Sequence, residues 1–138
     1  MFDIIRGPDK ILRTSTSGVE TEVTDVMSSF NGNGFTVKEG GGNNATNANG
    51  QQLVAWCWKA GGAGSSNSNG TITSSVSVNQ EAGFSIVTWT GDGNVNSTVG
   101  HGLNGRPDFI MLKARTYGAN WRIYHLSLIH IWRCRRRG

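Results

Sequence analysis

Short runs of alternating apolar and polar residues, separated by turns rich in Gly and Asn, recur along this chain. Residues 35–38 and 70–80 alternate as half-buried strands do. The Asn-Gly-Asn-Gly sequence of residues 31–34 is a strong turn signal. The chain holds 20 Gly and only two Pro, and residues of high helix propensity are sparse. This pattern predicts an all-β fold of strands joined by tight turns.

The strongest strand pattern covers residues 53–60. Its two faces, Leu53/Ala55/Cys57/Lys59 and Val54/Trp56/Trp58, are both largely apolar. We therefore expect a central strand covered on both sides. Residues 19–30 fit either strands or one or two helical turns. Other strands are expected at residues 2–5, 10–14, 84–90, 109–114 (buried) and 121–125.

The last segment, residues 126–138, reads as translated DNA of another origin. Residues 126–136 follow the codons of a transposase-based sequencing adapter in frame, if a TGA codon is read as Trp132. We interpret residues 126–138 as a non-native adapter translation and leave them out of fold reasoning. The native chain is then expected to be a fragment, interrupted near His125.

Charge depends on this segment. The chain has 13 Lys and Arg against 9 Asp and Glu, a formal net charge of +4. Four of these arginines and no acid lie in residues 126–138, which leaves nine bases and nine acids before them. The tail alone would suggest binding to nucleic acid or a membrane surface. Without it we predict no nucleic-acid partner, and no run approaches the about 20 apolar residues of a membrane span.

Internal similarity suggests a repeat. Gly-Phe opens two strand-like runs, at residues 34–37 and 83–87, and residues 2–6 are similar to residues 121–125. Fixed-period similarity is the signature of repeat architectures. The predicted organisation is listed in chain order: residues 1–60 as the back half of one β unit, 61–69 as a Gly/Ser/Asn-rich linker or loop, 70–125 as the front half of the next unit.

Few residues suggest chemistry. His101, between two glycines, could be a ligand or a base, but no second His, Cys or carboxylate lies at metal-ligand spacing, which favours a turn cap. Asp92 lies in a Gly-Asp-Gly-Asn sequence that resembles part of a calcium loop and lacks its other ligands. Cys57 is expected to be a small buried hydrophobe. We predict no catalytic residue, no cofactor, no metal and no enzymatic activity.

Aromatic residues are the better indication of binding. Tyr117, Trp121 and Trp58 are the residues expected to contact glycan, because flat rings offer a large apolar area at little entropic cost. The other reading places Trp56 or Trp58, Trp89 and Trp121 in the core. Tyr117, in a predicted loop, is the ring most expected to be exposed.

Several motifs in order carry a resemblance. They are Phe2-Asp3-Ile4-Ile5-Arg6-Gly7, Asn33-Gly34-Phe35-Thr36-Val37, Val54-Ala55-Trp56-Cys57-Trp58-Lys59-Ala60-Gly61-Gly62, Ala82-Gly83-Phe84-Ser85-Ile86-Val87, Val99-Gly100-His101-Gly102-Leu103, Pro107-Asp108-Phe109-Ile110-Met111-Leu112-Lys113 and Trp121-Arg122-Ile123-Tyr124-His125. Residues 2–125 thereby resemble a family of domains of unknown function from tailed bacteriophages, which occurs in large, repeated, Gly/Asn/Thr-rich virion proteins near tail genes.

The resemblance implies an antiparallel β-sandwich of jelly-roll or lectin-like (concanavalin A-like) kind. It implies a virion structural or tail-fibre module that contacts host surface glycan. Its partners would be other virion subunits, with a homo-oligomer in the parent protein. The protein would be made in the host cytoplasm and end in the virion. The family offers no established catalytic residues to carry over.

The alternative function is a carbohydrate-active domain of glycoside hydrolase type. Such enzymes need two carboxyl groups facing one cleft. The acidic residues here are scattered, and only Glu20 and Glu22 form a same-face strand pair.

Overall fold

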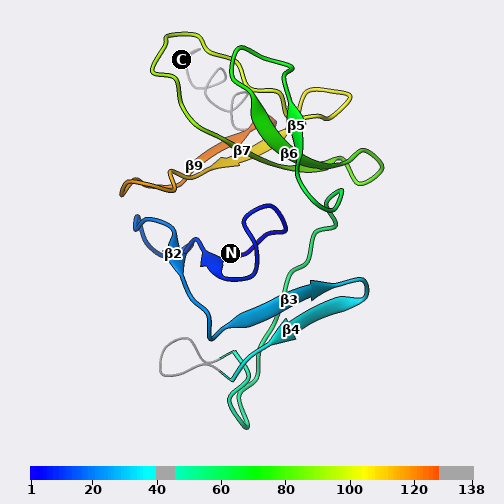
Figure 1. The fold of residues 1–138 in the computed structure, drawn as a ribbon, viewed down its shortest axis with the longest axis vertical. Coiled ribbons are helices and arrows are strands. Elements are labelled where there is room, and N and C mark those ends of the chain that lie inside the picture. The colour runs from blue at the N-terminus through cyan, green and yellow to red at the C-terminus, as the bar shows by residue number, and fades with distance from the viewer. Residues whose placement is uncertain (40–45, 128–138) are drawn as a thin grey trace, which may run out of the picture. The chain divides into compact units, whose positions relative to one another are not determined.

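The computed structural model describes residues 1–39 and 46–127, and these contain nine β-strands (Figure 1). The strands are β1 (Lys10–Ile11), β2 (Thr21–Glu22), β3 (Met27–Asn31), β4 (Gly34–Val37), β5 (Ser65–Asn67), β6 (Ser74–Asn79), β7 (Phe84–Trp89), β8 (Phe109–Leu112) and β9 (Arg122–His125). All pairings between them are antiparallel. The predicted all-β class is confirmed, whereas the sandwich or jelly-roll type stays a prediction.

The chain divides into two compact units. The terminal unit comprises Met1, Leu12–Glu20 and Gly105–Gly138, and the central unit comprises Phe2–Ile11 and Thr21–Asn104. The terminal unit contains the β8–β9 hairpin, in which Phe109 is paired with His125 and Leu112 with Arg122. Residues 128–138 of the predicted adapter translation lie outside the described part of the chain.

The central unit is built around β6, the middle strand of the sheet β5-β6-β7. Val76 and Ser77 in β6 are 3% and 1% exposed, so both faces of the strand are covered. Ser77 Oγ donates to the carbonyl of Gly62 at 2.6 Å, which brings the chain before β5 onto one face. The sequence pattern predicted that this strand would be exposed on one side, and that expectation is wrong. A buried hydroxyl is tolerated here because it has a hydrogen-bond acceptor.

The β3–β4 hairpin (Figure 1) confirms the predicted turn and the predicted strand after it. Residues 31–34 make the expected turn, and Asn31 is paired with Gly34 across it. A register shift between Met27 and Ser29 marks a β-bulge. The ambiguous segment 19–30 therefore forms strands β2 and β3 and no helical turn. Of the described residues, none lies in a helix long and apolar enough to cross a membrane.

Residues 53–60 are the main departure from expectation. They form no strand and run as an irregular trace before β5 (Figure 1). Trp56 is 75% exposed and Trp58 67% exposed, so the predicted central strand covered on both sides is wrong. The segment has the alternation of a strand but no neighbouring strand among the described residues, and pairing requires a neighbour.

Candidate functional site

The loop between β8 and β9, residues 113–121, carries the most exposed tyrosine ring of the terminal unit. We call it the Tyr117 loop. Tyr117 is 67% exposed, as the sequence predicted. An exposed ring on an ordered loop can contact a flat ligand surface without first losing conformational freedom. Whether the Tyr117 loop is ordered depends on the contacts of its other residues.

Lys113 anchors the first end of the Tyr117 loop. Its Nζ donates to the carbonyls of Ser17 at 3.3 Å, Gly18 at 2.7 Å and Ala114 at 3.0 Å. An ammonium group has three donors, and all three have acceptors here. The lysine therefore ties the loop to a segment about a hundred residues earlier in the sequence.

Arg115 makes the second tie. Its Nε and one terminal nitrogen donate to the two carboxylate oxygens of Glu20, each at 2.9 Å. The Glu20 backbone N–H donates to the Arg115 carbonyl, also at 2.9 Å. Bidentate arginine–carboxylate pairs fix geometry more firmly than single contacts do. Side chain and backbone thus hold the same two residues together.

The far end of the loop is held by Ala119 and Trp121. The Ala119 N–H donates to the Ser17 carbonyl at 2.9 Å. Trp121 is half-buried, and its Nε1 donates to the Arg13 carbonyl at 3.0 Å. Tyr117 therefore lies between residues that are hydrogen-bonded to the segment 13–20 on both sides of it, and its ring is exposed.

Of the residues expected to contact glycan, Tyr117 and Trp121 belong to this one loop. Trp58 is exposed but belongs to the central unit. The expectation of tryptophans in a core is wrong for Trp56 and Trp58, and Trp89 is 43% exposed. No sequence signal identified Lys113 or Arg115 as anchors, because their partners are remote in the sequence.

A second candidate lies in the central unit, on residues 98–104, which we call the strap. The strap covers the face of β6 that carries Ser74 and Val76. Ser74 Oγ donates to the Gly100 carbonyl at 3.1 Å. A methyl group built on Gly102 would lie 3.1 Å from Cγ1 of Val76, so the strap approaches β6 closely. Residues 98–103 form this irregular covering segment, with one isolated bridge at Val99.

Both ends of the strap are tied down. Thr98 and Thr71 exchange hydrogen bonds, each backbone N–H donating to the other's Oγ1, at 2.9 and 3.0 Å. At the other end, Gln80 donates its amide to the Gly102 carbonyl and accepts the Asn104 N–H at 3.1 Å. These ties give the strap a fixed path on β6.

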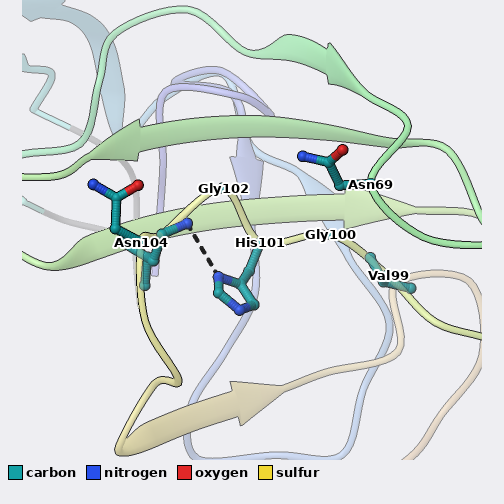
Figure 2. A pocket seen from close by; sticks show the side chains of 7 residues that line it. Asn69, Val99, Gly100, His101, Gly102 and Asn104 are labelled. Atoms are coloured by element: carbon teal, nitrogen blue, oxygen red, sulfur yellow. Dashed lines mark hydrogen bonds between the residues drawn. The ribbon is translucent and has the colours of Figure 1, made fainter.

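His101 caps the turn of the strap, as predicted. Its Nδ1 accepts the Leu103 backbone N–H at 3.1 Å (Figure 2). A nitrogen that accepts carries no proton, so the neutral ring has its proton on Nε2. The ring borders a cavity of about 350 Å³. The lining residues are Asn69, Val99, Gly100, His101, Gly102, Leu103 and Asn104.

The cavity offers neutral hydrogen-bonding groups. Asn69 and Asn104 each provide an amide, and His101 provides an imidazole (Figure 2). No Asp or Glu is among the lining residues. Among the described residues, no group of three or more His, Cys, Asp or Glu side chains is placed to hold a metal ion. The cavity suits a small neutral polar group such as a hydroxyl or an amide.

The predicted partial calcium loop is closed by its own side chains. The Asp92 carboxylate accepts the Asn94 N–H at 3.0 Å and the Ser97 hydroxyl at 2.8 and 2.9 Å. The bond from the Asn94 backbone N–H, followed by those from Ser97 and the Asn94 side chain, lowers the pKa of Asp92. These bonds stabilise the ionised carboxylate and order the loop.

Three other predicted residues complete the picture. Cys57 is exposed, so the expectation of a buried thiol is wrong. Glu20 is held by Arg115, and Glu22 pairs with Lys10 at 2.5 Å. The two carboxylates considered for the enzyme alternative thus have different cationic partners, and they belong to different units.

Fold and site together define an all-β domain in which irregular segments are fastened to short sheets. Residues 1–134 match a family described as "Domain of unknown function (DUF7483)", and the chain belongs to that family. The match includes residues 126–134, and the interpretation of residues 126–138 as adapter translation stays a prediction. Neither the curated proteins nor the solved structures contain a match to this chain.

Proposed function

We propose that this chain is a structural module of a tailed-bacteriophage virion, of tail-fibre type, that contacts host surface glycan through the Tyr117 loop. The phage assignment rests on the resemblance of residues 2–125 to virion proteins. Membership of a family of unknown function is compatible with this role and does not choose it. A fold alone does not give a function, so the proposal depends on the loop.

The observation that supports a glycan contact is the Tyr117 loop, which is held in place by hydrogen bonds. Its ring is 67% exposed, while Lys113, Arg115 and Ala119 fasten the loop around it. Preorganisation of this kind reduces the entropic cost of binding. Tyrosine also combines an apolar ring face with a hydroxyl, which suits the mixed apolar and polar surface of a sugar.

The contact is tested by binding of the full chain to an array of bacterial surface polysaccharides. Tyr117→Ala should reduce binding about tenfold or more, since truncating a central aromatic anchor commonly costs 2 kcal/mol or more. Thr116→Ala, beside it on the same loop, is the matched control and should bind as the parent does. Equal binding by the parent and Tyr117→Ala would remove this loop from the proposal.

A further inference from the structure

The segment of residues 53–58 exposes more apolar surface than its sequence would lead one to expect. Leu53 is 63% exposed, Val54 71%, Trp56 75% and Trp58 67%. Contiguous apolar surface of this kind on a protein marks an interaction site. Trp and Val also favour paired, half-buried strand positions.

The backbone of the segment is unpaired as well. In the part of the chain that the structure describes, the N–H and C=O groups of residues 53–58 make no hydrogen bond. Beside the segment, the Gln51 N–H donates to the Ala48 carbonyl and the Lys59 carbonyl accepts the Asn79 amide. The segment has the sequence pattern of a strand, but it pairs with no other described segment.

We propose that residues 53–58 pair antiparallel with the same residues of a second copy of this chain, about a two-fold axis at Trp56. A two-fold axis requires each residue to face one an even number of positions away, because only those share a face. Centred on Trp56, the pairing sets Trp56 opposite its own copy, Val54 opposite Trp58 and Ala55 opposite Cys57. Every apolar residue on the Trp face then meets an apolar partner.

Charge and side-chain type along the segment are compatible with pairing to a second copy. The segment carries no charge, and Lys59 would face Leu53, so no like charges are opposed. Four Trp rings gather on one face of the pair, and aromatic pairs across strands are favourable. The smaller Ala55 and Cys57 lie together on the other face.

The area that the proposed dimer buries indicates how tightly the two copies bind. A large aromatic side chain can bury about 150–250 Å², and Trp56 and Trp58 are 75% and 67% exposed. The two rings of each copy therefore offer roughly 300 Å², less than the about 800 Å² per partner of a standard interface. The dimer should accordingly dissociate on dilution.

The test is the molar mass of the full 138-residue chain over a range of concentrations, in reducing agent, by sedimentation equilibrium. The mass should rise from one chain to two. At the high concentration the amides of residues 53–58 should exchange more slowly than at the low one. Exchange in this segment at equal rates, or a mass of one chain throughout, would overturn the proposal.

Two matched variants locate the contact. Trp56→Lys opposes two positive charges across the axis and should leave only single chains, and it should fold because Trp56 is exposed. Met111→Lys places the same charge on β8, whose four residues are also exposed, and should dimerise as the parent does. A dimer that survives Trp56→Lys, or that is lost equally in Met111→Lys, contradicts the pairing. None of these outcomes depends on whether the chain belongs to a virion.

Discussion

At the scale of single residues, the backbone conformation of Gly102 determines the path of the strap. Its φ is +75°, in the left-handed region that favours glycine. Gly100, two residues before, approaches the loop after β5 so closely that a methyl group would overlap the Asn69 carbonyl. The glycines on either side of His101 therefore have separate structural reasons, one conformational and one steric.

Gly102→Ala should destabilise the folded chain by about 1–3 kcal/mol, since non-glycine residues in this region carry backbone strain. The added methyl would also press on Val76 Cγ1. Urea unfolding followed by tryptophan fluorescence measures the change. Gly91→Ala is the control, because a methyl there meets nothing within 4 Å, and it should stay within about 0.5 kcal/mol of the parent.

Asp92 gives a prediction for pH. Its pKa is lowered in the folded chain, first by the Asn94 backbone N–H. A lowered native pKa means that its bonds stabilise the loop above the ordinary pKa of Asp and are lost as the pH falls through the lowered value. An NMR titration of the Asp92 carboxyl should give a midpoint below that of an Asp in an unstructured peptide.

Ser97→Ala should move that Asp92 midpoint upwards, because it removes the hydroxyl donor that lies within hydrogen-bond distance of both carboxylate oxygens. A midpoint unchanged by Ser97→Ala would show that the hydroxyl does not stabilise the charge. The Asp92 carboxylate is fully exposed. The expected effect of Ser97→Ala is therefore a change in the titration midpoint of Asp92.

At the scale of elements, β6 depends on what covers each face. The strap covers the face of Ser74 and Val76, and the chain before β5 covers the face of Ser77. The central unit thus encloses its middle strand with irregular segments. Serine hydroxyls replace apolar packing where these segments supply carbonyl acceptors.

Ser77→Ala should cost about 1 kcal/mol of unfolding free energy, since it removes the hydrogen bond from the buried Ser77 hydroxyl to the Gly62 carbonyl. The matched control is Ser28→Ala, whose hydroxyl is exposed and lies 3.5 Å from the Thr36 carbonyl. Chemical denaturation of both variants gives the comparison. Equal stabilities would mean that the Ser77 bond contributes nothing net.

The elements show what local sequence can predict. The turn at residues 31–34 and the strands β4, β6, β7, β8 and β9 follow from apolar and polar patterns and turn residues, which are local properties. The pattern of residues 19–30 left β3 undecided between a strand and helical turns. Burial does not follow: residues 109–114 were expected to be a buried strand, yet Phe109 is 50% exposed. Alternation tells which residues share a face but leaves open what covers that face.

The candidate sites divide in the same way. The turn cap at His101 and the exposed ring of Tyr117 were predictable, because each depends on a few neighbouring residues. The anchors of the Tyr117 loop were not, since Lys113 and Arg115 bind residues 17–20 and nothing local indicates that meeting. Asn69 was not predictable as a cavity residue either, because the other lining residues are about 30 positions later in the sequence.

At the scale of the whole molecule, the proposed structural role uses two exposed surfaces. In the proposals above, the Tyr117 loop contacts glycan and the exposed apolar residues 53–58 pair with a second copy. A module of a larger particle would use surfaces of both kinds, because assembly buries apolar area and adsorption leaves binding loops outside.

The most direct test of the virion assignment is quantitative mass spectrometry of purified phage particles from a culture that carries this gene. Peptides from residues 1–125 should be enriched in the particles together with the other virion proteins. They should remain with the particles through a density gradient. Peptides found only in the cell lysate, with none in particles of normal yield, would contradict the account.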